Sequence, residues 1–286
     1  ANADVRGHLF DAVQYWMGEF DIDGLRLDAA DVIDKGFLSE LAGFTKSRNP
    51  DFWLMGEVVH GDYRDWAAPN RLDSVTNYEC FKGLYSSFND RNLFEIAWSL
   101  NRQFAEGGLY RHLALYNFAD NHDVSRVASL LKDTANLLPL YTILFSMPGV
   151  PSLYYGSEFA LKGDKQQGDE VLRPALSLDD TLEKFLLDPL KRLAKARREV
   201  PVLGGGSYRQ LFLASEQLAF AREAQGQVAL TLINAADQPA FIEFSLEGYA
   251  GVTFYDVLNP DFHYTCRGAT VSLQLPPHAS MLLAND

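Results

Sequence analysis

The feature that most constrains the fold is an alternation of helical and strand patterns over the first two hundred residues. Residues 5–20 carry apolar side chains at helical spacing, and the polar turn 21–24 separates them from a short strand at 25–28. Further strands are predicted at 52–58, 73–77, 112–118 and 151–155, and further helices at 37–44, 94–104, 137–145 and 182–198. Alternating strands and helices predict βαβ units around a parallel sheet.

The pattern changes near residue 207. Short runs of alternating apolar and polar residues follow, separated by turn sequences, at 210–213, 218–221, 228–233, 240–244 and 271–275. Such runs are typical of an antiparallel β-sandwich. We therefore expect two domains, an α/β part over residues 1–200 and a sandwich over 201–286, with a flexible turn at the glycines 204–206.

Composition excludes several classes of partner. The 286 residues carry a formal net charge of −13, which argues against a nucleic acid or an anionic membrane surface as the partner. The most apolar stretch, 137–155, is interrupted by three prolines and does not resemble a membrane span. Cys80 and Cys266 lie far apart and are predicted to be free thiols. We expect a soluble protein and leave open whether it is cytoplasmic or secreted.

Acidic residues stand at three of the predicted strand ends. Arg26 and Asp28 share one face of the strand 25–28, Glu57 ends an apolar strand, and Asp123 ends the polar run after Phe118. A carboxylic acid in apolar surroundings tends to stay protonated, which suits Glu57 as a general acid. A structural Arg–Asp pair and a loop position for Glu57 are the alternatives. Carboxylates that act in pairs at the carboxyl ends of barrel strands are typical of glycoside hydrolysis.

Four segments resemble the conserved regions of the alpha-amylase family, glycoside hydrolase family 13. Their sequences are Gly-Leu-Arg-Leu-Asp-Ala-Ala at 24–30, Gly-Glu-Val at 56–58, Phe-Ala-Asp-Asn-His-Asp at 118–123, and Pro-Gly-Val-Pro-Ser-Leu-Tyr-Tyr-Gly-Ser-Glu at 148–158. All four occur in the family's order, and the last 80 residues are similar to the family's sandwich domain. The resemblance implies a (β/α)8 barrel and a retaining hydrolase that cleaves α-1,4-glucosidic bonds of starch or maltodextrins.

The resemblance also implies roles for single residues. Asp28 would be the nucleophile, Glu57 the acid and then the base, and Asp123 the residue that binds hydroxyls of the distorted sugar. Arg26 would keep Asp28 ionised and oriented, and His122 would bind the same sugar. In a retaining enzyme the carboxyls of Asp28 and Glu57 should lie about 5–5.5 Å apart.

Aromatic side chains near the strand ends are candidate platforms for sugar rings. Tyr78 is the best placed of them, because we expect it to end a strand, and the others are Trp53, Trp66, Tyr154 and Tyr155. Many family members carry an aromatic residue two positions after the glutamate that Glu57 matches, where this chain has Val59. His60 follows Val59 and is a further candidate for substrate binding.

The sequence also departs from the family pattern. Asp31 and Val32 stand where many members carry a basic residue that binds sugar and a histidine that helps to hold calcium. Nothing matches the family's first conserved region, and five of eight barrel strands are predicted. We therefore expect that an N-terminal half-barrel is needed, in cis or as a second chain. Calcium would bind only through that portion; no other cofactor is expected, and no metal ligands are assigned.

Two other functions stay open. A transglycosylase or isomerase of the same family would share the three acids and pass the glycosyl unit to another sugar. A non-catalytic carbohydrate-binding or interaction protein is the alternative of another class, and the presence of all three acids argues against it. Product analysis with maltooligosaccharides separates these possibilities.

Overall fold

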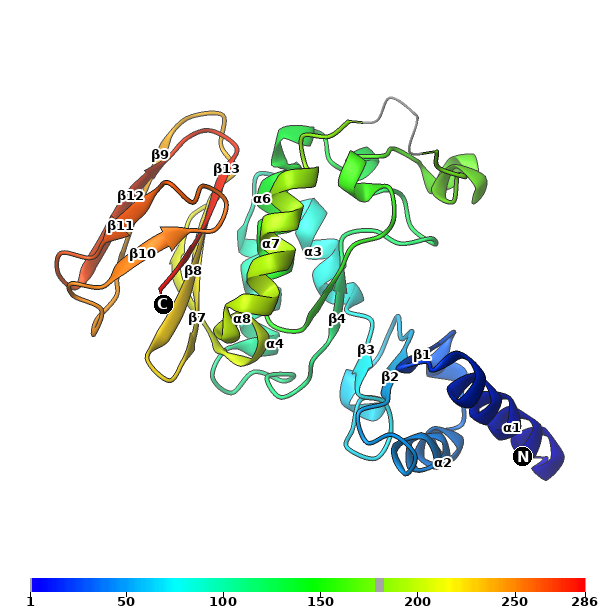
Figure 1. Ribbon diagram of the computed structural model, residues 1–286. Coiled ribbons are helices and arrows are strands. Elements are labelled where there is room, and N and C mark those ends of the chain that lie inside the picture. Colours follow the sequence, from blue (N-terminus) through cyan, green and yellow to red (C-terminus); the bar gives the residue numbers. More distant parts are fainter. Residues whose placement is uncertain (1, 178–182, 286) are drawn as a thin grey trace. The chain divides into compact units, whose positions relative to one another are not determined.

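The short parallel strands predicted for the first part of the chain are present, and they fall into two units. The computed structural model describes residues 2–177 and 183–285 (Figure 1). Its internal contacts divide the chain in two. Unit 1 comprises residues 1–78 and 112–116, and unit 2 comprises residues 79–111 and 117–286.

Unit 1 is built around a parallel three-stranded sheet. Its strands are β1 (Gly24–Leu27), β2 (Trp53–Gly56) and β3 (Ser74–Val75), in that order across the sheet. Its helices are α1 (Ala3–Phe20), η1 (Ala30–Val32), α2 (Lys35–Lys46) and η2 (Tyr63–Asp65). The side chains of Asn2 and Asp34 accept backbone N–H groups of α1 and α2, which fixes where these two helices begin.

The register of this sheet places the carboxyl ends of β1 and β2 side by side. Leu27 pairs with Gly56, and the Glu57 N–H donates to the Leu27 carbonyl at 2.9 Å. A side chain at residue 56 would place its Cβ 2.7 Å from the Ala30 Cβ, so the close approach of the two chain segments requires glycine. Asp28 and Glu57, which follow these strand ends, are therefore neighbours.

Unit 2 begins with helices. They are α3 (Tyr78–Asn89), α4 (Phe94–Phe104), α5 (Val127–Leu130), η3 (Thr134–Asn136), α6 (Leu137–Ser146), η4 (Ser157–Phe159), η5 (Lys165–Gln167), η6 (Glu170–Leu172), α7 (Leu187–Glu199) and α8 (Pro201–Gly205). Strands β4 (Tyr116–Phe118) and β5 (Val150–Ser152) form a two-stranded sheet. Two residues at the starts of these elements, Tyr78 and Tyr116, belong to unit 1, where Tyr116 forms a parallel bridge with Thr76.

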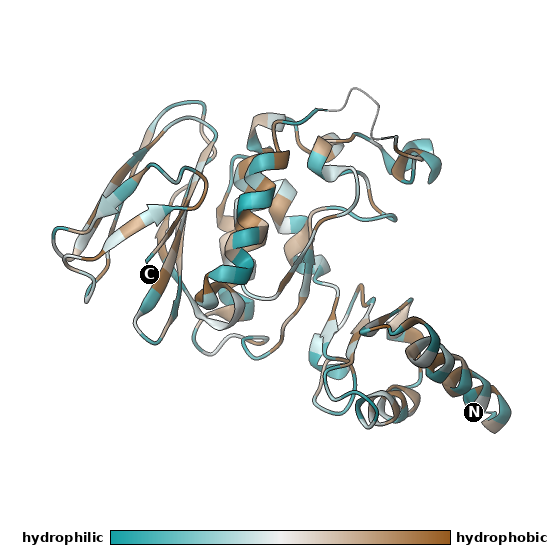
Figure 2. Ribbon diagram, viewed as in Figure 1, coloured by the Kyte–Doolittle hydropathy of each residue, from teal (hydrophilic) through white to brown (hydrophobic). Residues whose placement is uncertain are grey.

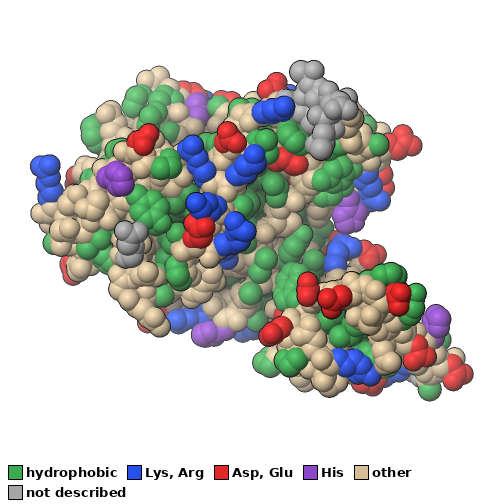
Figure 3. All heavy atoms as spheres, viewed as in Figure 1, with side chains coloured by type: hydrophobic (Ala, Val, Ile, Leu, Met, Phe, Trp, Pro, Cys, Tyr) green, Lys and Arg blue, Asp and Glu red, His purple; other side chains and the backbone are tan. Residues whose placement is uncertain are grey.

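Helices α6 and α7 differ in how much of their surface is buried. All residues of α6 except Leu138 are buried, as expected for a helix that is apolar all round. Helix α7 buries only Leu190, Leu193 and Ala196. Its visible side is hydrophilic in Figure 2, and Figure 3 shows Lys and Arg side chains gathered over it. The positive charges near its carboxyl end suit the helix dipole.

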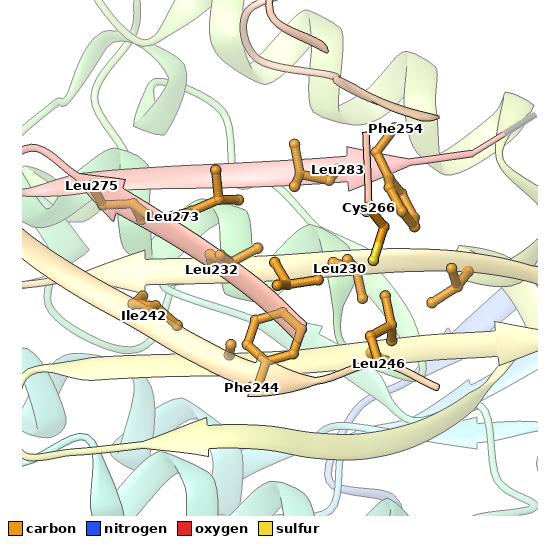
Figure 4. Close-up of a cluster of buried hydrophobic side chains, with 14 residues drawn as sticks. Leu230, Leu232, Ile242, Phe244, Leu246, Phe254, Cys266, Leu273, Leu275 and Leu283 are labelled. Carbon is orange, nitrogen blue, oxygen red and sulfur yellow. The ribbon is translucent and has the colours of Figure 1, made fainter. Parts of the chain in front are cut away.

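The last 80 residues form two antiparallel sheets. The six-stranded sheet has the order β11-β10-β13-β8-β7-β6, and β9 pairs with β12 in a second sheet. The strands are β6 (Ser207–Leu213), β7 (Gln217–Ala224), β8 (Gln227–Asn234), β9 (Ala240–Ser245), β10 (Thr253–Asp256), β11 (His263–Thr265), β12 (Thr270–Leu275) and β13 (Ala279–Ala284). Buried side chains of both sheets form one core, which includes Leu230, Ile242, Phe244, Leu273 and Leu283 (Figure 4).

The two sheets differ in how much of each strand is buried. Strands β9 and β12 alternate between buried and partly or fully exposed residues, so one face of this sheet is open. Strand β8 is buried at every residue after Gln227. The reason is that α6 contacts β8 and β13 on the other face, and Thr142 Oγ1 lies 2.8 Å from Ser280 Oγ.

Buried Arg222 ties the sandwich to the helices of unit 2, and half-buried Arg197 ties α7 to the segment after α6. Arg222 of β7 donates to the carbonyl oxygens of Ser146, Leu203 and Gly206 at 2.8–3.2 Å, and Arg197 of α7 donates to the Gly149 carbonyl. Burial lowers the pKa of Arg222 to about 9, and nearby Arg197 adds to this effect. Carbonyl oxygens at the carboxyl ends of α6 and α8 therefore take the place of a carboxylate partner of Arg222.

The observed elements follow the predicted pattern with several differences. Strands are present at all five predicted places, and all but β1 are shorter than predicted. The closure of an eight-stranded barrel stays a prediction. Helix α3 was not predicted, and Tyr78 begins it instead of ending a strand. Gly204 and Gly205 lie in α8, not in a turn. The helix predicted from residue 182 begins at Leu187, and Leu182 lies outside the described residues.

The expected domain boundary near residue 200 lies shortly before the first antiparallel strand, which begins at Ser207, whereas the contacts divide the chain after Tyr78. The assignment of residues 1–200 to a barrel and 201–286 to a sandwich domain therefore stays our proposal. Among the described residues, none of the helices combines the length and the apolar character needed to cross a membrane.

Candidate active site

In unit 1, one guanidinium group joins the two carboxylates at the strand ends. Arg26 Nη1 lies 2.8 Å from Asp28 Oδ1, and Arg26 Nη2 lies 3.1 Å from Glu57 Oε2. Arg26 lies in β1, and Asp28 is the first residue after this strand. The side chain of Asp28 is 79% exposed and that of Glu57 is 13% exposed, so the two acids differ in their access to solvent.

The turn after Asp28 is closed by Glu57. The backbone N–H of Ala29 donates to Glu57 Oε2 at 3.3 Å, and the N–H of Ala30 donates to the Glu57 carbonyl at 2.8 Å. Ala29 has a φ of 43°, in the left-handed region that residues other than glycine rarely adopt. Such backbone strain persists only where the surroundings determine the conformation, and here the Glu57 contacts do so.

The surroundings of Glu57 differ from the apolar environment that the sequence predicted. The prediction gave Arg26 to Asp28 alone, but the guanidinium reaches both acids. Tyr78 Oη also donates to Glu57 Oε1 at 3.3 Å. The strand before Glu57 is apolar, yet its last residues lie beside β1, and β1 supplies the cation across the sheet.

In unit 2, the residues after β4 form a second group of candidate site residues. His122 Nε2 lies 2.9 Å from Asp123 Oδ2, and Arg173 Nη2 lies 2.9 Å from Asp123 Oδ1. Asn121 Oδ1 accepts the backbone N–H groups of Asp123 and Val124 at 2.8 and 3.2 Å. The polar run after Phe118 therefore folds into a tight turn that presents His122 and Asp123 together.

Asp120, the first acid of this run, has a different role. It is 2% exposed and accepts the Val127 N–H at 3.0 Å and the Ser157 hydroxyl at 2.9 Å. Burial raises the pKa of the Asp120 carboxyl, and these hydrogen bonds and Arg126 partly oppose the effect. Asp120 thus anchors the turn beneath Asp123.

The other predicted contacts with substrate have mixed surroundings. His60 is exposed on the bend after β2. Trp66 is buried, which does not fit a platform for sugar rings. The ring of Tyr154 has the Arg126 guanidinium 4.1 Å from its centre, so one of its faces is covered, whereas Tyr155 is 41% exposed. The roles of His60 and Tyr78 in substrate binding stay predictions.

Sequence reasoning missed two arginines near Asp123. Arg173 contacts Asp123 from fifty residues further along the chain, and no local motif marks it. Arg126 is fully buried and donates to the carbonyl oxygens of Tyr155 and Leu172, both at 2.6 Å. The signal that could have revealed Arg126 is its position, three residues after Asp123 and next to an apolar stretch.

One group of metal-capable side chains occurs within the described part of the chain. It comprises Asp133, Asp237 and His278, whose ligand atoms lie within 4.8 Å of one another. Arg91 Nη2 already lies 2.5 Å from Asp237 Oδ2, and His278 Nε2 lies 3.1 Å from Asp237 Oδ1. Arg91 thus supplies positive charge beside the Asp237 carboxylate, where a metal ion would otherwise do so. Cys80 and Cys266 are buried free thiols, as predicted.

Comparison with known proteins gives a family match over most of the chain. The family model described as the alpha amylase catalytic domain matches residues 1–198. A cyclomaltodextrinase from Thermoanaerobacter pseudethanolicus is 29% identical over 84% of this chain and 42% of its own length. Neopullulanase 2 from Thermoactinomyces vulgaris is 28% identical over 99% of this chain and 48% of its own length. The chain thus spans less than half the length of these curated relatives.

Solved structures give the same result. The crystal structure of an Anoxybacillus alpha-amylase superposes with a TM-score of 0.86 and 27% identity, over all of this chain and 64% of the other. The Geobacillus thermoleovorans alpha-amylase, solved with acarbose, superposes with a TM-score of 0.85 and 26% identity over the same shares.

Proposed function

Because the chain belongs to the alpha-amylase family, we propose that its protein is a retaining glycoside hydrolase that cleaves α-1,4-glucosidic bonds of starch or maltodextrins. The observation that carries the proposal is the position of Arg26 between the carboxylates of Asp28 and Glu57. Relatives named cyclomaltodextrinase and neopullulanase support an α-glucan substrate, and cyclodextrins belong among the substrates to test.

In the first step of the proposed reaction, an oxygen of Asp28 attacks the anomeric carbon. Glu57 donates its proton to the glycosidic oxygen, the bond from carbon to that oxygen breaks, and the leaving sugar departs with the proton. The product is a glycosyl ester on Asp28. The high exposure of the Asp28 side chain supports the nucleophile role, because the attacking oxygen must reach the sugar.

In the second step, the Glu57 carboxylate takes a proton from water, whose oxygen attacks the anomeric carbon. The ester bond to Asp28 breaks, and both acids return to their first state. Arg26 and the Ala29 N–H face Glu57 Oε2 and suit the carboxylate form. Tyr78 Oη faces Oε1 and can donate to the carboxylate or accept from the acid, so it accommodates both forms.

Unit 2 would supply groups that bind the reacting sugar. In the proposal, Asp123 accepts hydroxyl groups of the sugar and stabilises the developing positive charge, and His122 donates to the same sugar. Both side chains are about one-third exposed, which leaves them accessible to a ligand. The contact between His122 and Asp123 supports a joint role, since one imidazole orients one carboxylate.

The test is to incubate the intact protein with maltooligosaccharides and cyclodextrins and to follow the first product by proton NMR. We expect new reducing ends in the α configuration, because two displacements at one carbon retain its configuration. A first product in the β configuration would contradict the proposal. Redistribution of chain lengths without new reducing ends would indicate a transglycosylase instead, and binding without turnover would indicate a carbohydrate-binding protein.

A further inference from the structure

Arg173 contacts the side chain of Asp123 and the main chain beside it. It follows the short helix η6. Its Nη2 group lies 2.9 Å from Asp123 Oδ1, and its Nε group donates to the His122 carbonyl at 3.2 Å. One guanidinium therefore fixes both a carboxylate oxygen and the peptide that carries it, a geometry that a planar fork of donors makes possible.

The two oxygens of the Asp123 carboxylate are held by different donors. Oδ1 faces Arg173, and Oδ2 faces His122 Nε2, each at 2.9 Å. Rotation of the carboxylate would break both contacts, so its plane is fixed. The three side chains are 34–45% exposed, and the group is thus accessible to a ligand while its orientation is determined by the protein.

The main chain on both sides of Arg173 is tied to the segment after β5. Buried Arg126 donates to the carbonyls of Leu172 and Tyr155 at 2.6 Å, and Tyr155 Oη donates to the Pro174 carbonyl at 2.9 Å. Asp169, one turn before Arg173, pairs with Lys165, and its Oδ2 also lies 3.8 Å from the Arg173 guanidinium. These contacts hold Arg173 in place although it lies in a segment with little regular structure.

We propose that Arg173 is a positioning residue for Asp123 in the glycosidase reaction, an inference that rests on the proposed function. Arg173 fixes the direction of the Asp123 carboxylate before substrate binds, so that the carboxylate meets the distorted sugar without reorganisation. Hydrogen bonds to charged groups contribute enough to account for a change in rate of about ten- to a hundredfold. A contact that matters most in the transition state lowers kcat more than it raises KM.

The experiment measures kcat and KM of the intact protein and of three variants on one maltooligosaccharide. We expect Arg173→Ala to lower kcat about ten- to a hundredfold with a smaller change in KM. Arg173→Lys should recover part of the loss, since an ammonium can reach Asp123 but not the His122 carbonyl as well. Guanidinium ion at millimolar concentration should restore part of the activity of Arg173→Ala. The matched control is Arg209→Ala, which removes a similarly exposed ion pair with Glu223 in the sandwich and should keep wild-type kinetics.

Each outcome decides the inference. Wild-type kinetics of Arg173→Ala would overturn it and leave the proposed function intact. A loss of activity that neither lysine nor guanidinium restores, together with a lower melting temperature, would show a structural role and also overturn it. Asp123→Asn is measured in parallel, because near-normal activity of that variant would remove the proposed role of Asp123 itself.

Discussion

Unit 1 and unit 2 orient their candidate carboxylates in opposite ways. In unit 1, one cation, Arg26, holds two carboxylates that follow neighbouring strands. In unit 2, one carboxylate, Asp123, is held by two donors, and one of them comes from fifty residues away. Unit 1 therefore obtains its geometry from the register of a sheet, and unit 2 obtains it from contacts between a turn and a distant segment.

This difference has a physical consequence for replacement of the cations. Without Arg26, two neighbouring carboxylates would face each other with no cation to hold them together. Without Arg173, Asp123 would keep His122 and lose only one of its two donors. We therefore expect the geometry of unit 1 to be the more sensitive of the two to single substitutions.

The largest effect is expected at the two acids of unit 1. Asp28→Asn and Glu57→Gln should each lower kcat by about four orders of magnitude or more, because each removes a group that takes part in bond cleavage. Both variants should keep the wild-type melting temperature. Asp31→Asn, three residues after Asp28, is the matched control and should retain activity.

A substrate with an activated leaving group separates the roles of the two acids. A dinitrophenyl α-glucoside needs no proton on its leaving oxygen, so Glu57→Gln should cleave its bond far better than it cleaves maltooligosaccharides. Asp28→Asn should remain inactive on both substrates, since the nucleophile is missing. Equal rescue of the two variants would contradict the assignment of roles.

The second effect compares the two arginines directly. Arg26→Lys should lower kcat about a hundredfold, because one ammonium cannot serve Asp28 and Glu57 with the geometry of a planar fork. Arg173→Lys should lower kcat about tenfold or less, because only one carboxylate is affected. Steady-state kinetics on the same maltooligosaccharide provide the measurement. A larger loss at Arg173 than at Arg26 would reverse the comparison between the two units.

The part of the site in unit 1 was the more predictable from sequence. Short strands that end in Asp28 and Glu57 place these residues at one edge of a parallel sheet, and the pattern is local in sequence. The sequence did not reveal that Arg26 serves both acids, since this depends on the register that pairs Leu27 with Gly56. Arg173 was not predicted at all, because its contact with Asp123 depends on the path of a long segment that has no periodicity.

The same distinction holds for the fold. Alternating patterns predicted β9 and β12, whose sheet has one open face, and also predicted the core of β8. The short strands β10 and β11 were missed, since three or four residues give too little alternation to detect. Helix α3 was missed because a strand was expected to continue to Tyr78. Local patterns thus identified elements, and tertiary contacts determined where they end.

The third effect tests the buried anchor beneath Asp123. The folded pKa of Asp120 is raised by burial, so the folded state holds this proton at pH values where the unfolded chain has lost it. The contribution of Asp120 to the free energy of unfolding is therefore fully present below about pH 4, and it is lost as the pH rises through the folded pKa. The variant Asp120→Asn has no titratable carboxyl at this position, so it lacks this contribution to the pH dependence. Each unit of pKa difference corresponds to about 1.4 kcal/mol, or about 2–4 °C in melting temperature.

The measurement is the melting temperature of the wild type and of Asp120→Asn from pH 4 to pH 8. The difference between wild type and variant should be most favourable to the wild type at pH 4 and should decline toward neutral pH. A difference that grows with pH would mean that Asp120 is held as a carboxylate. Its hydrogen bonds to Val127 and Ser157 would then outweigh its burial.

The smallest effect is expected at His278, which lies in unit 2 and contacts Asp133, Asn136 and Asp237. Its φ of 48° is in the left-handed region, its Nδ1 lies 3.2 Å from Asn136 Oδ1, and its Nε2 lies between carboxylates of Asp133 and Asp237. His278→Asn tolerates this backbone but loses the Nε2 contacts. Because Arg91 still pairs with Asp237, the melting temperature should fall by only a few degrees. kcat should not change. A fall in kcat comparable to that of Arg173→Lys would show that Asp123 depends on the whole of unit 2, and the local account of its orientation would be wrong.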